Sequence, residues 1–278
     1  MVKIAVLTNK TKDKSFSIAD KVVSYLAGKS EVYMPDDGML LTDYGVRYLP
    51  YNEIFKVAEI AIVIGGDGTI LRAAPDCAMS KIPALGINLG TVGFLTEVEV
   101  SDIENSLDKL LRGQYIKERR MLLKATINDG EECHVLNDIV VSKRDHQQLM
   151  HLDLFADGEL VYHYKADGLI IATPTGSTGY SISAGGPVVD PELESILLTP
   201  LCPHSLVDRS LIFKPDAVVT VESSEGNRLC VSSDGGAPQY IENGCKAVIS
   251  RAEFTANFIR IKSDNFIDIL YKKLAQRR

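Results

Sequence analysis

The chain has 278 residues, which is enough for two domains of ordinary size that each bury a core. Its composition, 45% hydrophobic and 24% charged residues, is typical of a globular protein, and no apolar run approaches the roughly 20 residues that a membrane-spanning helix needs. The net charge of −7 argues against a general nucleic-acid-binding or anionic membrane surface. We therefore expect small-molecule partners, with no nucleic acid and no membrane.

The N-terminal sequence and the cysteines bear on the compartment. The first residues, Met-Val-Lys-Ile-Ala-Val-Leu-Thr, form too short an apolar stretch for a secretory signal, so we expect a cytoplasmic protein. Its five cysteines are odd in number, scattered and without a C-x-x-C pair. This spacing predicts reduced, mostly buried thiols and indicates neither a disulfide framework nor a zinc site.

Residues 1–115 alternate between buried strands and amphipathic helices, the pattern of a Rossmann-like α/β domain with a parallel sheet. We expect strands at 2–8, 31–34, 60–64 and 83–87, and helices at 15–29, 52–57 and 101–113. A further short helix at 69–74 should end or kink at Pro75, because proline lacks the amide that a helix interior needs.

The strand at 60–64 ends abruptly in Gly65-Gly66-Asp67-Gly68-Thr69. In open α/β sheets, ligands bind beyond the carboxyl ends of parallel strands, and glycines there let backbone amides approach a phosphate. A carboxylate at such a place suggests a base or a metal contact in phosphoryl transfer to a hydroxyl. The simpler reading of Asp67 is an aspartate that stabilises a turn. A second glycine-bearing loop, 88–94, follows the next strand and should face the same edge.

From about residue 116 the pattern changes to short strands with hairpin signals at Asn128-Asp129-Gly130 and Asp157-Gly158. Residues 116–254 should therefore form an all-β, sandwich-like domain. We expect the final helical segment, within about 255–278, to pack back on the first domain.

Residues 165–191 contain a strand flanked by polar loops, and the segment from Thr173 to Gly179 consists almost entirely of hydroxyl and glycine residues. Backbone amides and hydroxyls of this kind suit sugar and phosphate oxygens, although a flexible linker has a similar composition. Asn137-Asp138 lies within a strand-like pattern, where an amide next to a carboxylate marks either a ligand contact or else a bulge or strand end. No G-x-x-x-x-G-K-S/T motif is present, and the third glycine of a dinucleotide fingerprint is replaced by Leu71.

The chain resembles the NAD kinase family in four segments, taken together and in this order: Gly65-Gly66-Asp67-Gly68-Thr69, Asn137-Asp138, Asp167-Gly168 and the run from Thr173 to Pro187. The resemblance spans nearly the whole chain. It implies that ATP, with Mg²⁺ or another divalent metal, phosphorylates the adenosine-ribose 2′-hydroxyl of NAD to give NADP. It also implies a homo-oligomer, either a dimer or a tetramer.

The same resemblance implies roles for individual residues. Asp67 would be the catalytic base, and the metal would enter with the nucleotide phosphates rather than occupy a site of its own. The residues implied to bind phosphate or ATP are Gly65, Gly66, Gly68 and Thr69. Those implied to bind NAD are Asp67, Gly68, Arg72, Phe94, Asn137, Asp138, Lys165, Asp167, Thr178, Gly179, Tyr180, Ser181 and Ser183. At two of these positions the chain departs from the family, because many relatives carry Glu at 138 and Arg or His at 165.

Two alternatives remain open at this stage. A lipid or diacylglycerol kinase shares the Gly-Gly-Asp-Gly turn, but it needs an apolar acceptor pocket or a membrane surface. A non-enzymatic dinucleotide sensor would use Asp67 only to shape the turn. The sequence leaves open whether ATP, another nucleoside triphosphate or polyphosphate is the donor, and whether NADH is accepted.

Overall fold

The computed structural model describes residues 1–37, 41, 44–90, 93–127, 130, 132–143, 150–204, 209–223, 229–241, 246–262 and 266–276. Asn128, Asp129 and Cys245, and part of the loop 88–94, lie outside these residues. The chain divides into two compact units, one formed by Met1–Arg119 with Thr255–Arg278 and the other by Arg120–Phe254.

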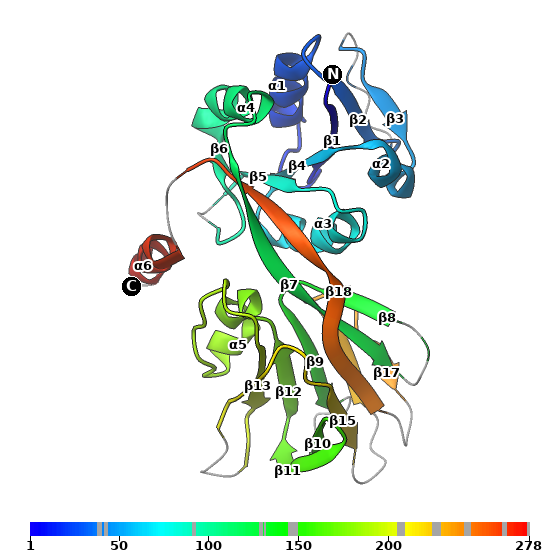
Figure 1. Cartoon of the computed structure of the whole chain (residues 1–278), viewed down its shortest axis with the longest axis vertical. Helices are drawn as coiled ribbons and strands as arrows, with labels where there is room; N and C mark the ends of the chain where they lie inside the picture. The colour runs from blue at the N-terminus through cyan, green and yellow to red at the C-terminus, as the bar shows by residue number, and fades with distance from the viewer. Residues whose placement is uncertain are drawn as a thin grey trace. The chain divides into compact units, whose positions relative to one another are not determined.

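The first unit is a parallel sheet with helices on both faces (Figure 1). The strand order β3-β2-β1-β4-β5 is that of a Rossmann-like fold, so the predicted class is confirmed. Its strands are β1 (Lys3–Thr8), β2 (Glu31–Pro35), β3 (Arg47–Leu49), β4 (Ile60–Gly65), β5 (Ala84–Asn88) and β6 (Val98–Glu99). Its helices are α1 (Ser17–Leu26), α2 (Tyr51–Val57), α3 (Asp67–Met79), η1 (Val100–Asp102), α4 (Ile103–Leu111) and α6 (Phe266–Gln276).

Every residue of β4 is buried, because the sheet is covered on both sides. Helices α1 and α4 place Val22, Leu26 and Leu107 in a core with strand residues such as Ile62 and Ile87. Helices α2 and α3 lie on the other face (Figure 1). The polar turn after β4 therefore stands on a fully buried strand, at the edge of the sheet where ligands bind in such folds.

Helix α3 corrects one prediction. It begins at Asp67 rather than at residue 69 and runs through Pro75 to Met79, so the helix does not end at Pro75. Five of its side chains are buried on one stripe: Ile70, Ala73, Ala74, Cys77 and Ala78. Two of them follow the proline, so the burial of this stripe outweighs the loss of one helical hydrogen bond. The expected mostly buried thiols are also corrected, because among the four free cysteines that are described only Cys77 is buried.

Two strands contribute to both units. Strand β7 (Ile116–Ile127) starts in the first unit, and β18 (Lys246–Arg260) ends there, where Phe258 pairs with Ala84 of β5 in parallel. Ile259, next to it, belongs to the core of the first unit.

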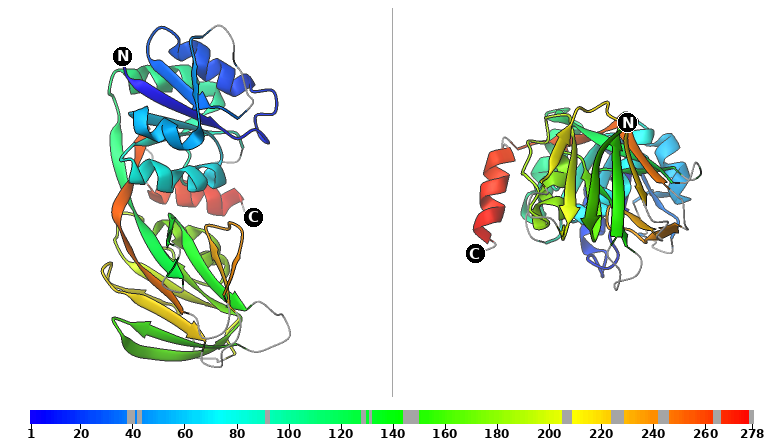
Figure 2. Two further views of the ribbon diagram at one scale, coloured as in Figure 1. Left: turned by 90° about the vertical axis from the view of Figure 1, so that its right-hand side faces the viewer. Right: turned by 90° about the horizontal axis from the view of Figure 1, so that it is seen from below.

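The second unit consists of antiparallel strands in two sheets around one core, and the predicted β-sandwich is confirmed (Figure 2). One sheet contains β11-β10-β15-β18, with β7 pairing with β18 and β8, and the other has the order β14-β13-β12-β9-β16-β17. The strands are β8 (Glu132–Val135), β9 (Asp138–Lys143), β10 (Met150–Ala156), β11 (Glu159–Ala166), β12 (Gly168–Ala172), β13 (Ile196–Leu201), β14 (Leu211–Phe213), β15 (Val219–Ser223), β16 (Leu229–Ser233) and β17 (Gln239–Ile241). The short helices η2 (Thr175–Thr178) and α5 (Tyr180–Ser183) follow β12.

The predicted hairpin at Asp157-Gly158 is confirmed, since β10 and β11 pair in antiparallel fashion on either side of it. Both turn residues have positive φ angles, 51° and 83°, which matches a two-residue hairpin turn in sheets with a right-handed twist.

Candidate functional site

The turn between β4 and α3 is built around the hydroxyl of Thr69. The side-chain amide of Asn9 donates to Thr69 Oγ1 at 2.9 Å, and the amide of Gly66 donates to it at 3.4 Å. A Cβ atom on Gly65 would lie only 2.2 Å from that oxygen, so the close approach requires glycine there. The turn holds Asp67 at the first position of α3, beside the positive end of the helix dipole.

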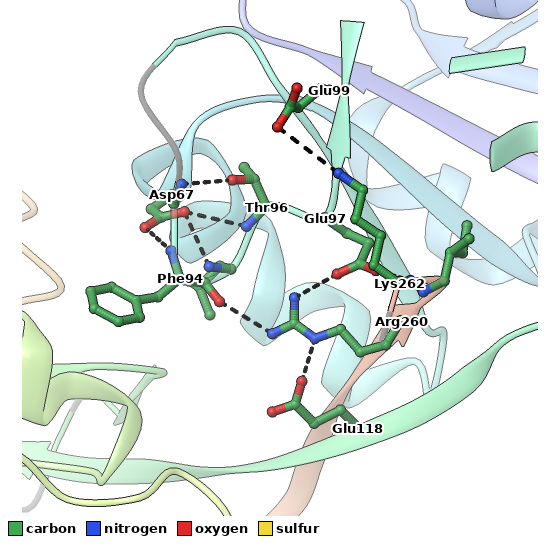
Figure 3. Close-up of polar contacts among 11 residues, drawn as sticks. Asp67, Phe94, Thr96, Glu97, Glu99, Glu118, Arg260 and Lys262 are labelled. Atoms are coloured by element: carbon green, nitrogen blue, oxygen red, sulfur yellow. Dashed lines mark hydrogen bonds and ion pairs between the residues drawn. The ribbon is translucent and has the colours of Figure 1, made fainter. Parts of the chain in front are cut away.

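The carboxylate of Asp67 accepts hydrogen bonds from three consecutive backbone amides of the neighbouring loop (Figure 3). The amide of Phe94 donates to Oδ2 at 2.8 Å, and the amides of Leu95 and Thr96 donate to Oδ1 at 3.2 and 3.3 Å. A Cβ atom on Gly93 would lie 1.8 Å from Oδ1. The two loops predicted to meet at this edge of the sheet do meet, through the carboxylate of Asp67 and through a 2.7 Å hydrogen bond from the amide of Leu89 to the carbonyl oxygen of Gly65.

A buried ion-pair network holds the far side of the same loop (Figure 3). Arg260, at the end of β18, donates to the carbonyl oxygen of Phe94 at 3.1 Å and to Glu97 at 3.1 Å, and it also pairs with Glu118. Glu97 in turn accepts the amides of Ile261 and Lys262 at 2.7 and 2.6 Å. The 94–97 loop is thus fixed from both sides, and the orientation of Asp67 is fixed with it.

Two basic side chains lie near the glycine turn. The ammonium of Lys12 lies 2.7 Å from the point where a Cβ atom on Gly66 would be, and 3.9 Å from the equivalent point on Gly90. Arg72 lines a cavity of about 310 Å³ together with Asn9, Lys10 and Thr69. Sequence reasoning identified Arg72 but missed Asn9 and Lys12, although both directly follow the first predicted strand, where such folds place ligand contacts.

In the second unit, Leu136 and Asn137 connect β8 to β9, so the polar pair stands at a strand end. The carboxylate of Asp234 accepts the backbone amides of Leu136, Asn137 and Asp138 at 2.8, 2.8 and 3.0 Å. Asp234, which sequence reasoning missed, therefore fixes the conformation of the Asn137-Asp138 segment.

Asp138 is 5% exposed. Burial, and next the nearby charge of Asp234, raise the pKa of Asp138 to about 7, against the effect of a hydrogen bond from the amide of Tyr180. Burial also raises the pKa of Asp234, but three backbone amides stabilise its charged form. The charged form is therefore the better stabilised of the two at Asp234, which accepts three backbone amides where Asp138 accepts one.

The loop after β12 packs tightly on the Asn137-Asp138 segment. The hydroxyl of Thr173 donates to the carbonyl oxygen of Leu136 at 2.6 Å. A Cβ atom on Gly176 would lie 2.1 Å from the carbonyl oxygen of Asn137. A Cβ atom on Gly179 would lie 3.2 Å from Nδ2 of Asn137 and 3.4 Å from Oδ2 of Asp138. The structure thus brings Asn137, Asp138 and Gly179 together.

The other predicted residues of this loop differ in exposure. Tyr180 and Ser183 are exposed, and Thr178 is half-buried. Ser181 is fully buried, and its hydroxyl lies 2.8 Å from that of Thr199. Its hydroxyl therefore has a structural partner, and a ligand contact by Ser181 stays a prediction.

Lys165 and Asp167 lie near the junction of β11 and β12. Lys165 is exposed, and its carbonyl oxygen accepts the amide of His204 at 2.8 Å. Asp167 forms an ion pair with Lys143 at 2.5 Å. The predicted residues therefore form two sets: Gly65 to Thr69, Arg72 and Phe94 in the first unit, and Asn137 to Ser183 in the second.

No group of three or more His, Cys, Asp or Glu side chains among the described residues has the arrangement of a metal site. None of the helices described is both long and apolar enough to cross a membrane.

Two family models match the chain. The ATP-NAD kinase N-terminal domain matches residues 4–115, and the ATP-NAD kinase C-terminal domain matches residues 136–261. A NAD kinase of Caldanaerobacter subterraneus subsp. tengcongensis is 39% identical over 283 residues, with 100% of both chains covered. A NAD kinase of Thermoanaerobacter pseudethanolicus is 40% identical over 286 residues, again with 100% of both chains covered.

Two solved structures share the fold. The NAD kinase from Archaeoglobus fulgidus in complex with ATP has a TM-score of 0.75 at 27% identity and covers 99% of each chain. Yeast NADH kinase complexed with NADH has a TM-score of 0.90 at 24% identity, over 99% of this chain and 88% of that one.

Proposed function

Because the chain belongs to the ATP-NAD kinase family, we propose that it transfers the γ-phosphoryl group of ATP to the adenosine-ribose 2′-hydroxyl of NAD, which gives NADP and ADP. The observation that carries the proposal is that both family domains match, in order, the parts of the chain that contain the two sets of site residues. Neither a lipid kinase nor a dinucleotide sensor is favoured by these relatives.

Asp67 is the proposed general base. It takes the proton of the 2′-hydroxyl while that oxygen forms a bond to the γ-phosphorus, and the bond from phosphorus to the bridging oxygen of ADP breaks. A base must keep its orientation throughout this step. The three amides of the 94–96 loop supply that support, because they hold both oxygens of the carboxylate.

Neutralisation of phosphate charge is the other requirement of phosphoryl transfer. We assign this role to the turn residues Gly65, Gly66, Gly68 and Thr69, at the N-terminus of the 13-residue helix α3. Lys12 and Arg72 are the proposed cationic contacts, since both lie beside this turn.

The proposed NAD contacts come from both sets. Phe94 would stack on the adenine ring, and Arg72 and Lys165 would contact phosphates. Asn137, Asp138 and Asp167 would bind hydroxyl or amide groups of NAD, together with the loop residues Thr178, Gly179, Tyr180, Ser181 and Ser183. Asp138 is one methylene shorter than the Glu of many relatives, so we expect a water molecule to bridge it to the ligand.

A divalent metal is part of the proposal. Mg²⁺ usually keeps several waters and is held by one or two carboxylates plus substrate phosphates, so it needs no dedicated cluster of ligands. The described residues fit this mode, because Asp67 places a carboxylate at the turn where the phosphates are proposed to bind. When bound, the metal would neutralise charge on the phosphate oxygens. The homo-oligomeric state and the cytoplasmic location stay predictions.

A panel of donors and acceptors tests the proposal. Purified protein should form NADP from NAD and ATP in the presence of Mg²⁺, and the panel should include NADH, other nucleoside triphosphates and polyphosphate. A diacylglycerol acceptor serves as the control for lipid kinase activity. Absence of NADP with every donor and metal would refute the proposed function.

A further inference from the structure

Helix α6 contacts the two residues of the first unit on which the proposed acceptor site depends. The ammonium of Lys273 lies 3.6 Å from Oδ2 of Asp67 and 4.5 Å from the centre of the Phe94 ring. The ring of Phe266, at the start of the same helix, lies 6.1 Å from that of Phe94. One helix therefore contacts both the proposed base and the proposed adenine-stacking residue.

These contacts occupy positions that a bound acceptor would use. The oxygen of Asp67 that faces Lys273 is Oδ2, whose other partner is the amide of Phe94. A ribose hydroxyl that gives its proton to Asp67 must reach this carboxylate within hydrogen-bond distance. An adenine ring stacked on Phe94 needs a ring face, and the Lys273 ammonium lies over the ring.

The helix is attached weakly enough to be displaced. Among the side chains described in α6, from Phe266 to Lys273, none is buried. Ile267 and Tyr271 are 63% and 77% exposed. The Lys273 and Asp67 side chains are themselves 26% and 27% exposed, so water screens their attraction. Side chains that stay partly exposed, and an ion pair to Asp67 that is itself partly exposed, hold a helix less firmly than burial in a core does.

We propose that α6 is an autoinhibitory cap: Lys273 and Phe266 occupy the acceptor side of the Asp67 site, and NAD binds only when α6 moves away. The proposal rests on the proposed function, because it takes Asp67 and Phe94 to be NAD contacts. By thermodynamic linkage, whatever weakens the cap strengthens NAD binding, and NAD binding releases the cap.

The test compares three full-length variants with the parent protein. Lys273→Gln removes the ammonium, and Phe266→Ser removes the ring contact without changing the charge. Lys272→Gln is the matched control, since it removes the same charge from the neighbouring, exposed position of the same helix. NAD affinity is measured by titration calorimetry without ATP, and release of the helix by hydrogen exchange of the 266–276 amides with and without NAD.

We expect Lys273→Gln and Phe266→Ser each to lower the dissociation constant of NAD by about two- to fivefold, the effect of one exposed ion pair or ring contact. The 266–276 amides should exchange faster in both variants without ligand, and faster in the parent once NAD is added. Lys272→Gln should match the parent.

Weaker or unchanged NAD binding by Lys273→Gln would overturn the cap, as would slower exchange of α6 in the presence of NAD. Those results would show that α6 assists the ligand or does not affect it. If neither the parent nor any variant binds NAD, the proposed function itself fails, and the proposed cap fails with it. If NAD binds but leaves the exchange of the 266–276 amides unchanged, the cap is overturned while the proposed function stands.

Discussion

The backbone amide of Phe94 donates a 2.8 Å hydrogen bond to Oδ2 of Asp67, so the residue proposed to contact adenine also orients the residue proposed to accept the proton. The two are 27 positions apart in the chain and come from loops after adjacent parallel strands, β4 and β5. A change to either loop should therefore affect both NAD binding and the proton-transfer step.

Replacing Asp67 by Asn should separate these two effects. The amide side chain cannot accept a proton, so turnover should fall about 10²- to 10⁴-fold, the usual contribution of a general base, while NAD binding is retained. Initial rates and NAD titrations check this, and the melting temperature shows whether the 94–96 loop still folds. Asp36→Asn, at an exposed acid of the same unit, is the control. Full turnover in Asp67→Asn would remove Asp67 from the mechanism.

Replacing Gly93 by Ala tests the packing of the loop against Asp67. The added methyl would lie 1.8 Å from Oδ1 and 2.5 Å from Oγ1 of Thr96, and the carboxylate cannot yield without losing its amide contacts. We expect a loss of stability of about 1–3 kcal/mol, as for other overpacked sites, and a lower kcat. Chemical denaturation measures the first effect. Gly68→Ala is the control for stability, because a methyl there meets no atom within 4 Å.

Replacing Arg260 by Met tests the ion-pair network behind the loop. The change removes the buried guanidinium that pairs with both Glu97 and Glu118, and such losses cost about 3–5 kcal/mol. Arg251→Met is the matched control: its pair with Glu194 is 32% and 42% exposed, and exposed pairs contribute about 0–1 kcal/mol. Equal free energies of unfolding for the two variants would show that the network does not stabilise the unit.

The acid pair of the second unit should make stability depend on pH. The pKa of Asp138 is about 7 in the folded protein and about 3.9 in an unfolded chain, so between these values the folded state binds more protons. Its stabilising contribution is complete below about pH 4 and is lost as the pH rises to about 7. Asp138→Asn should flatten this part of the stability profile, measured by denaturant unfolding from pH 4 to 8. Asp216→Asn, at a 75% exposed acid, should leave it unchanged.

The sequence predicts the parts of the fold that depend on local pattern. Buried strands such as 60–64, the hairpin at Asp157-Gly158 and the amphipathic helices follow from periodicity and turn chemistry. The prediction of a helix end at Pro75 is wrong, because it considered the local effect of proline without the buried stripe of α3, which only the folded sheet provides.

The candidate site likewise has parts that the sequence predicts and parts that it does not. The meeting of Asp67 with the following loop is predictable, since neighbouring parallel strands end at one edge. The roles of Arg260 and Asp234 are not predictable in this way. Arg260 contacts Phe94, which is 166 positions away in the sequence, and Asp234 contacts Leu136, which is 98 positions away. No periodicity in one sequence specifies such pairings. Both residues act by supporting a loop, so neither belongs to a recognisable motif.

The placement of β18 has a consequence for synthesis on the ribosome. Phe258 pairs with the edge of β5, Ile259 completes the core of the first unit, and Arg260 closes the network at Glu97, yet all three are translated after residues 120–254. The α/β unit, although translated first, is therefore the last to be completed. Until β18 emerges, β5 pairs with β6 at Ile87 and Asn88 but lacks its partner at Ala84, and the core lacks Ile259, so this nascent chain should depend most on chaperones during translation of its second unit.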